Sequence, residues 1–409
     1  MEGSSELDGV IWRNILGMAI SFAIIVPFTQ ALSIYWQVFL LELDATPLII
    51  SLMYGVSSIV SAISMIYGGY LADRHGRKKL IAVFTFFTSL TFLAMYYATT
   101  WQEIFIIYIL QGLMGIYSPA VDAIIADSAP VQKRGKAYSI IFLIPRIMAV
   151  GAPYIALMFV VRYGLVHGMR RLMILAFITC ALAALIRAGF LRETLKERKA
   201  PRYSPAQYKY REVLNYVVKN IGGFLVFLVI LMFTLGLIYL EQLYVLVYLR
   251  VDYEAWAYII IMYMMITIAL TIPSGMIVDR VGRRASLGAS MVLAVISQAI
   301  LAFAPIGGAK LHVAVSFILF AFANSLGFTA YLTMMADLLP HEQRGRAYAV
   351  LRILESAAGI LGAIAGGLLY MLYPRLPFIA ATILSILGLI VSIMLGETLP
   401  KRVSNHGGE

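Results

Sequence analysis

The stretch G-Y-L-A-D-R-H-G-R-K occupies residues 69–78, and the related stretch G-M-I-V-D-R-V-G-R-R occupies residues 275–284. Both place a glycine, an Asp-Arg pair, a second glycine and two basic residues at the same spacing. Such a dense group of charges contrasts with the apolar sequence on either side of it. The two stretches therefore indicate polar loops between long apolar segments, repeated once along the chain.

Two further repeats follow in the same order. The pattern A-D-x-x-P-x-x-x-R-G-x-A-Y occurs at 126–138 and 336–348, and E-T-L occurs at 193–195 and 397–399. The three offsets are 206 (73 to 279), 210 (127 to 337) and 204 (193 to 397). Ordered matches at nearly one offset predict two homologous halves, a pattern typical of carriers built from internal repeats.

Composition places the chain in a membrane. Hydrophobic residues make up 61% of it and charged residues 13%, against about 45–50% and about 25% in soluble domains. The apolar residues form blocks of about 20, long enough to cross a bilayer as a helix. Helices are expected because lipid cannot satisfy exposed backbone N–H and C=O groups.

We therefore predict an all-α polytopic membrane protein of twelve spans in two pseudo-symmetric six-helix bundles. The N-terminal bundle covers residues 1–192, a polar cytoplasmic linker covers 193–220, and the C-terminal bundle covers 221–409. The spans are expected near 14–41, 46–72, 80–99, 103–126, 137–161, 169–191, 221–249, 255–278, 286–305, 312–336, 347–372 and 376–395.

Lysine and arginine are distributed unevenly between alternate loops. Of the 32 basic residues, 24 fall on the side of the N-terminus, six on the opposite side, and Arg146 and Arg352 inside spans. Basic loops face the cytoplasm, so both termini are predicted to be cytoplasmic in a cell membrane. The net charge of +11 thus reflects orientation in the bilayer, and no nucleic-acid partner is expected. The acidic, polar first residues indicate no cleavable signal peptide.

With its twelve spans, charged central stretch, repeat and two copies of the loop motif, of which the first is complete, the chain resembles the major facilitator superfamily. The resemblance covers nearly the whole chain. It implies a secondary transporter in which two bundles rock about a central cavity, with the first, fourth, seventh and tenth spans lining that cavity. It also implies that Asp73 contacts the start of the eleventh span, near Arg346.

The residue types in the loops suit a gate. Gly69 and Gly275 lack a side chain, so we expect a neighbouring helix to approach closely there. Asp73 can accept hydrogen bonds at a helix N-terminus, where the helix dipole favours a negative charge. The plainer alternative is that these charges only fix the topology.

Ion pairs are expected between each loop and the next span. Arg77 can reach Asp127, and Arg283 can reach Asp337 in the second half, while Asp279 would contact the start of the fifth span. The predicted gating set is Gly69, Asp73, Arg74, Gly76, Arg77, Asp127, Gly275, Asp279, Arg280, Gly282, Arg283 and Asp337.

Charges inside spans are costly and often functional. Arg146 lies twelve residues after Arg134, about 18 Å along a helix, so it is a candidate for binding an anionic substrate group or for pairing with a carboxylate. Arg352 and Glu355 share a helix face and can neutralise each other. The offset of 210 matches Glu355 to Pro145, so Glu355 and Arg146 can alternatively face each other.

Asp122, Glu241 and Glu355 are candidates for proton coupling, because removal from water favours the protonated form of a carboxyl group. Uncharged polar groups on the cavity spans are candidates for substrate contact, or alternatively for helix–helix hydrogen bonds. They are Gln30, Gln111, Asn324 and Tyr331.

The sequence narrows the function class further. Tyr108 stands three residues before Gln111-Gly112, where many drug/proton antiporters of the family carry arginine. The chain has no phosphate-binding loop for ATP, no metal-ligand cluster, no cofactor motif and no catalytic constellation, and its single Cys180 is expected to be an inert buried thiol. We therefore expect a monomeric, non-enzymatic carrier in the lipid bilayer that moves a small molecule, with protons as the coupling ion and export slightly favoured. Import of a sugar or carboxylate, or a transport-inactive membrane sensor, are the alternatives.

Overall fold

The computed structural model describes residues 2–129, 134–195, 210–339 and 344–399. Within these ranges the regular structure is helical and contains no strand. Eleven helical segments of the described chain are long and apolar enough to cross a membrane, and a bent helix pair raises the number to twelve. The prediction of an all-α polytopic membrane protein is confirmed.

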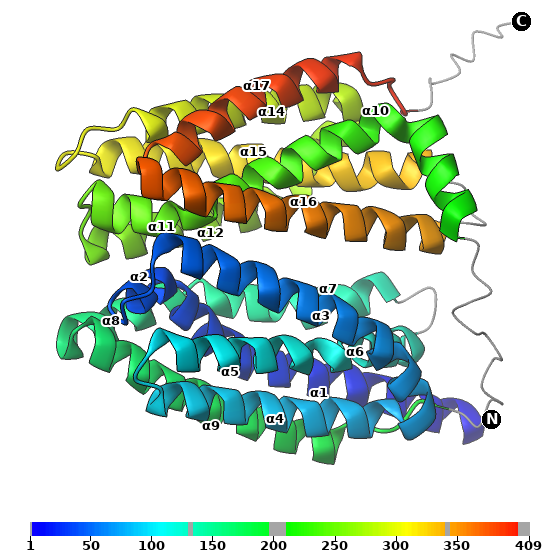
Figure 1. Ribbon diagram of the computed structural model, residues 1–409. Helices are drawn as coiled ribbons and strands as arrows, with labels where there is room; N and C mark the ends of the chain where they lie inside the picture. Colours follow the sequence, from blue (N-terminus) through cyan, green and yellow to red (C-terminus); the bar gives the residue numbers. More distant parts are fainter. Residues whose placement is uncertain (1, 130–133, 196–209, 340–343, 400–409) are drawn as a thin grey trace, which may run out of the picture. The chain divides into compact units, whose positions relative to one another are not determined.

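Packing divides the chain into two units, Met1–Ser204 with Tyr239–Ile261, and Pro205–Ile238 with Met262–Glu409. Unit 1 contains α1 (Glu2–Ser33), α2 (Trp36–Leu41), α3 (Pro47–His75), α4 (Arg77–Tyr97), α5 (Trp101–Met114), η1 (Gly115–Tyr117), α6 (Ser118–Ser128), α7 (Arg134–Ala149), α8 (Ala152–Tyr163), α9 (Leu165–Phe190), η4 (Ile238–Leu240, from Tyr239 on), α11 (Glu241–Leu243), η5 (Tyr244–Tyr248) and the first half of α12 (Tyr253–Ala269) (Figure 1). Unit 2 contains the rest of α12 with α10 (Tyr210–Leu237), α13 (Thr271–Val281), α14 (Arg283–Ala302), α15 (Lys310–Leu338), α16 (Arg344–Leu372) and α17 (Leu376–Met394).

Prolines explain two of the breaks within spans. A proline ring clashes with the carbonyl four residues earlier and removes a backbone hydrogen bond. Pro153 lies four residues after Ala149, where α7 ends, and Pro273 lies four residues after Ala269, where α12 ends. The break after Ala269 bends the eighth span by 50°.

The first and seventh spans are less regular than the sequence analysis expects. The single helix expected over 14–41 is instead α1 and the separate short α2, divided at Ile34 and Tyr35. The helix expected over 221–249 ends at Leu237 and continues as η4, α11 and the π-helix η5. Short 3-10 and π segments inside a helix often mark functional sites.

Glycines allow two helices of unit 2 to pack closely. α10 and α16 lie side by side (Figure 1), and Cβ atoms built on Gly236, Gly362 and Gly366 would collide with backbone atoms of the facing helix. Gly362 and Gly366 have the G-x-x-x-G spacing that lets membrane helices approach.

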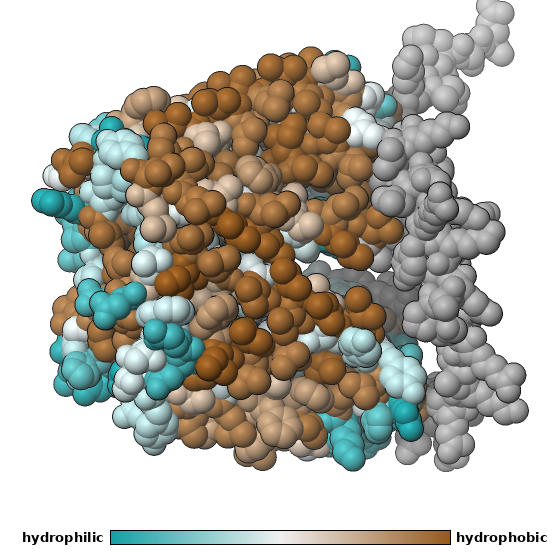
Figure 2. Space-filling view, in the orientation of Figure 1, coloured by the Kyte–Doolittle hydropathy of each residue, from teal (hydrophilic) through white to brown (hydrophobic). Residues whose placement is uncertain are grey.

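The outer surfaces of the helices are apolar, as a lipid environment requires. Large side chains such as Ile106, Leu185 and Met394 are more than half exposed, and hydrophobic residues cover most of the visible face in Figure 2. This exposed apolar surface agrees with the membrane assignment.

Candidate functional site

In unit 1 the first loop motif ties four helix ends together. Arg77 forms an ion pair with Asp127 at the end of α6, and its Nη2 lies 3.9 Å from Asp73 Oδ1. Its Nη1 also donates to Thr194 Oγ1 at 3.3 Å. Glu193 Oε2 accepts the backbone N–H of Lys78 at 2.9 Å and so caps the start of α4. The E-T-L sequence after the sixth span therefore belongs to the same cluster as the loop motif.

Unit 2 repeats this arrangement around Arg283. The Nε atom of Arg283 lies 3.1 Å from Asp337 Oδ2, and its Nη2 lies 3.3 Å from Asp279 Oδ1. Thr398 Oγ1 donates to Asp337 at 3.0 Å. Glu397 accepts the backbone N–H groups of Arg283 and Arg284 at 3.0 and 3.1 Å. Burial raises the pKa of Glu397, but the four backbone N–H groups that donate to its carboxylate lower the pKa by more. The pKa of Glu397 is therefore below its ordinary value.

The glycines of the two loop motifs differ in their surroundings and in their backbone conformation. A Cβ built at Gly69 or Gly275 meets no described atom of its own unit within 4 Å, so an approach by a helix of the other unit stays a prediction. Within unit 1 a close approach occurs one residue earlier, at Gly68, where a Cβ would collide with the carbonyl oxygen of Ile116. Gly76 and Gly282 have φ values of 90° and 105°, a conformation that glycine adopts without strain.

The other residues of the predicted gating set are exposed, or their expected partners belong to the other unit. Arg74 donates to Tyr70 Oη at 3.1 Å, and Arg280 is exposed. The expected contacts of Asp73 near Arg346, and of Asp279 with the start of the fifth span, would join the two units and stay predictions.

Charged residues within the spans fall into two groups. Asp122 on α6 and Arg146 on α7 are exposed, and Glu241 at the start of α11 is half-buried. Within the described residues of unit 1 none of the three has an ion-pair partner within 4.0 Å. Glu355 on α16 is instead buried and paired.

Glu355 has two partners in unit 2. Its Oε2 lies 3.1 Å from Arg352 Nη1, and its Oε1 accepts a hydrogen bond from the Tyr331 hydroxyl. Tyr331 and Asn324, seven residues apart on α15, both line a small cavity of about 80 Å³, and Asn324 Nδ2 donates to the Tyr263 hydroxyl at 2.9 Å. The structure thus brings three predicted residues together, Asn324, Tyr331 and Glu355.

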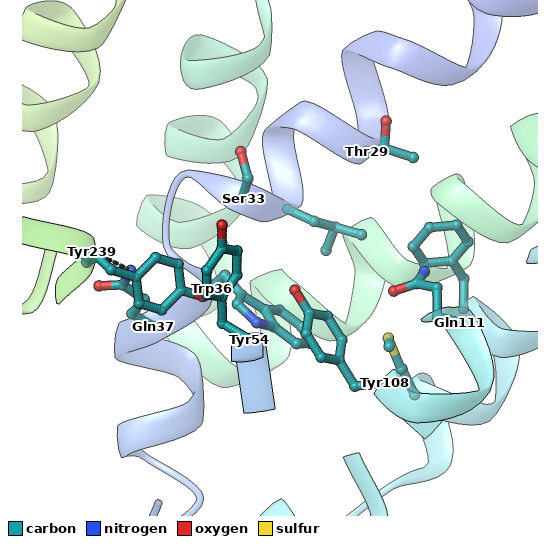
Figure 3. A pocket seen from close by; sticks show the side chains of 11 residues that line it. Thr29, Ser33, Trp36, Gln37, Tyr54, Tyr108, Gln111 and Tyr239 are labelled. Atoms are coloured by element: carbon teal, nitrogen blue, oxygen red, sulfur yellow. Dashed lines mark hydrogen bonds between the residues drawn. The ribbon is translucent and has the colours of Figure 1, made fainter. Parts of the chain in front are cut away.

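A larger cavity of about 390 Å³ lies in unit 1. Gln111 borders it, whereas Gln30 is exposed and accepts a hydrogen bond from Ser33 Oγ at 3.3 Å. The lining residues, shown in Figure 3, are Thr29, Leu32, Ser33, Trp36, Gln37, Tyr54, Phe92, Met95, Tyr108, Gln111 and Tyr239.

The cavity lies far from the charged loop cluster. Tyr54 and Asp73 are on the same helix, α3, nineteen residues apart, which corresponds to about 28 Å at 1.5 Å per residue. Each of these two sites therefore occupies its own end of the N-terminal helices.

Arg187 is buried, although its sequence position predicts a place among the cytoplasmic charges. Arg187, counted with the cytoplasmic charges by its sequence position, lies inside α9 with no exposed surface. Its Nε donates to Ser21 Oγ at 3.0 Å and its Nη1 to Thr85 Oγ1 at 2.6 Å, while its guanidinium carbon lies 4.8 Å from the centre of the Phe22 ring. Its position three residues before the end of a long apolar run could have indicated burial.

Tyr239, Tyr244 and Tyr248 are the tyrosines that the sequence suggests for an aromatic cavity wall, and of these Tyr239 lines the unit 1 cavity. The other aromatic lining residues were not predicted. Trp36 and Tyr54 fall in apolar runs where neither periodicity nor charge separates them from lipid-facing residues. No group of three or more His, Cys, Asp or Glu side chains in the described ranges is arranged to hold a metal ion.

Comparison with known proteins places the chain in a family. A family model described as Major Facilitator Superfamily matches residues 14–256 and 222–409. A protein of Bacillus subtilis (strain 168), YncC, whose name proposes metabolite transport, is 29% identical over 189 residues, which cover 44% of this chain and 37% of that protein. The Na(+), Li(+), K(+)/H(+) antiporter of Planococcus maritimus is 28% identical over 190 residues, covering 44% of this chain and 43% of the antiporter.

The matched segments thus span less than half the length of either relative. A solved structure, a variant of the nucleoside transporter NupG, has the same fold with a TM-score of 0.76 and 12% identity, covering 94% of this chain and 99% of that one. Proteins of the matched family are transporters and not enzymes. Because the family model covers nearly the whole sequence, from residue 14 to residue 409, the chain belongs to the Major Facilitator Superfamily.

Proposed function

We propose that this chain is a secondary active transporter that moves a small organic solute across the cell membrane by alternating access. The bundles of residues 1–192 and 221–409 rock about the linker 193–220, and both termini are cytoplasmic. Protons are the coupling ion, export is the favoured direction, and the monomer is the working unit.

The two loop clusters support the gating part of this proposal. Arg77 with Asp127 and Arg283 with Asp337 fasten the ends of the second, third and fourth helices of each half. A half held together in this way moves as one body, which rocking motions require. Asp73 and Asp279 lie exposed beside the two arginines, so they are free to contact a partner helix in one state of the cycle.

The observation that supports proton coupling is that two separate carboxyl groups lie within membrane spans and have no cationic partner in unit 1. Asp122 and Glu241 form no ion pair with a described residue of unit 1. A charge inside a span costs about 3 kcal/mol or more, so such a group gains by taking up a proton whenever it loses water. Protonation and release would then follow the opening of the site to either side.

One relative supports the same coupling. The name of the Planococcus maritimus protein states exchange of cations for H+. The match covers less than half of that protein, so it adds support to the carboxyl argument and does not stand alone.

The experiment is gradient-driven flux in proteoliposomes that contain the full chain. The variants are Asp122→Asn, Glu241→Gln, Glu355→Gln and the triple variant, and the control is Glu254→Gln, an exposed change at the start of α12. A substrate is first chosen from a panel by its stabilisation of the purified protein. We expect pH-gradient-driven accumulation to be lost in the triple variant, because a carrier without its titrating groups can only equilibrate the solute, and to be unchanged in the control.

Full gradient-driven accumulation by the triple variant would show that these carboxyl groups do not couple transport to protons. A folded wild-type protein that moves no compound of the panel under any gradient would argue against transport itself and favour a sensor role.

A further inference from the structure

Five aromatic side chains line the unit 1 cavity, and four of them form two stacked pairs. The rings of Trp36 and Tyr108 are stacked with centres 5.8 Å apart, and those of Tyr54 and Tyr239 are stacked with centres 4.3 Å apart. The volume of about 390 Å³ lies within the range of small-molecule sites. Aromatic walls of this kind bind flat molecules by stacking over their faces.

No lining residue carries a formal charge. An anion would lose its hydration beside the negative faces of the rings without gaining a cationic partner. A neutral ring loses little on entering, and an organic cation gains from the same ring faces. The wall therefore discriminates against negative charge.

The polar groups at the cavity define a second requirement. The hydroxyls of Thr29 and Ser33 donate their protons to backbone carbonyls of α1, at 3.2 and 2.7 Å, which leaves their oxygens available as acceptors. The Gln111 amide and the Tyr108 hydroxyl complete the polar side of the space, as Figure 3 shows. A ligand that donates a hydrogen bond matches this set.

The wall is held in place before any ligand enters. Gln37 Nε2 donates to the carbonyl oxygen of Tyr239 at 2.6 Å, and the Gln37 backbone N–H donates to Gln242 Oε1 at 2.7 Å. These bonds fix the irregular part of the seventh span against α2. A site formed in advance spends less binding free energy on ordering its side chains.

We propose that this cavity binds a planar aromatic compound that donates a hydrogen bond and carries no negative charge. The inference rests on the proposed transport function and names the substrate class for it. The cavity holds the compound at the end of the bundle remote from the Asp73 loop.

The test is equilibrium binding to the purified full chain, with three radiolabelled probes that share one ring system. Indole-3-methanol is neutral, tryptamine is a cation and indole-3-acetate is an anion, and all three keep the indole N–H donor. We expect indole-3-methanol and tryptamine to bind at least about tenfold more tightly than indole-3-acetate. Equal affinities for the three probes, or saturable binding of none at millimolar concentration, overturn the proposal.

Variants locate the site. Gln111→Leu removes the amide, and Tyr108→Arg places a positive charge in the wall, while Tyr154→Leu changes a half-exposed tyrosine of α8 that does not line the cavity. Gln111→Leu is expected to weaken the two favoured probes by about tenfold, the loss of a buried hydrogen-bond partner. Tyr108→Arg is expected to weaken tryptamine and strengthen indole-3-acetate, and Tyr154→Leu to change neither. A thermal melt of each variant confirms folding, and unchanged probe preferences in both cavity variants place the binding elsewhere.

These outcomes separate the two proposals. Binding is measured without a membrane gradient, so a failure here leaves gradient-driven flux of other solutes intact. Normal binding with no flux in proteoliposomes contradicts transport and leaves the site in place.

Discussion

At the scale of single residues, Glu193 and Glu397 do more than end their spans. Each carboxylate accepts backbone N–H groups at the start of another helix, α4 or α14. The first N–H groups of a helix lack partners within it, and a negative charge there also favours the helix dipole. The two E-T-L repeats are therefore helix caps supplied from the far end of each half.

The cap at Glu397 predicts a pH dependence of stability. Its pKa is lower in the folded protein, because four backbone N–H groups outweigh the effect of burial. The native state then holds fewer protons, so the cap contributes stability above the ordinary pKa of the group and loses it as pH falls through the lowered value. Glu397→Gln is expected to cost about 0.5–1 kcal/mol near pH 7, the low end for helix caps because water screens the site.

Thermal melting of Glu397→Gln and wild type between about pH 6 and pH 3 checks this. The difference in Tm is expected to shrink as the pH falls, with Glu254→Gln showing no such trend. A difference that grows toward acid pH would have the wrong sign for this cap.

The buried Arg187 gives a second prediction at this scale. Its guanidinium has hydroxyl and aromatic neighbours and no ion-pair partner within the described chain. Removing one hydrogen-bond partner leaves a buried charge with less compensation, so Thr85→Val is expected to cost about 1–3 kcal/mol. Arg187→Met removes the charge together with its desolvation penalty and is expected to cost less. Denaturation of both variants in the same detergent measures the two losses in free energy of unfolding. A larger loss for Arg187→Met than for Thr85→Val would mean that the charge itself stabilises the bundle.

At the scale of elements, the packing of α10 on α16 depends on glycine positions. A Cβ at Gly362 would collide with the carbonyl group of Phe233, whereas a Cβ at Gly359 would lie 3.7 Å from Met232 O, an ordinary contact. We expect Gly362→Ala to cost about 1–3 kcal/mol through overpacking. The matched Gly359→Ala is expected to be neutral or to stabilise by up to about 1 kcal/mol, because alanine favours helix. Equal losses in thermal stability for the two variants would show that the close helix contact is not limiting.

The same scale shows where sequence reading succeeds and where it does not. The spans over 137–161 and 255–278 are expected to be unbroken, yet the prolines at 153 and 273 carry the signal for their breaks, because the effect of proline on a helix is local. The change from α10 to the 3-10 and π segments follows no proline or charge, and it depends on packing against α2. The sequence does not show whether Gly68 or Gly69 faces a neighbouring helix, because one residue turns a helix by about 100° and that rotation is set by packing.

At the scale of the whole molecule, span number and repeat are the most predictable features. Bilayer thickness sets span length, and the repeated motifs lie at the ends of spans, so both can be read without tertiary information. The cavity could be predicted only in part. Gln111 was expected there as a polar residue in a span, but Trp36 and Tyr54 were not, since the chain has 25 tyrosines and packing decides which of them border a space.

The topology makes a direct prediction. In a Cys180→Ser background, single cysteines at Glu42→Cys and Ile306→Cys are expected to react with a membrane-impermeant maleimide in intact cells. Ser4→Cys and Ser404→Cys are expected to react only after permeabilisation, because both termini are predicted to be cytoplasmic. Labelling of only one terminus in intact cells would require an odd number of spans.

The central claim is that the chain carries solute through a site open to one side at a time, and counterflow tests it most directly. Proteoliposomes are loaded with an unlabelled compound that stabilises the purified protein, and uptake of its labelled form is followed with every ion gradient collapsed. A carrier exchanges solute without net transport, so we predict a transient accumulation of label above the outside concentration, absent from protein-free vesicles. Label that only equilibrates, at the same rate with and without the unlabelled load, would contradict alternating access.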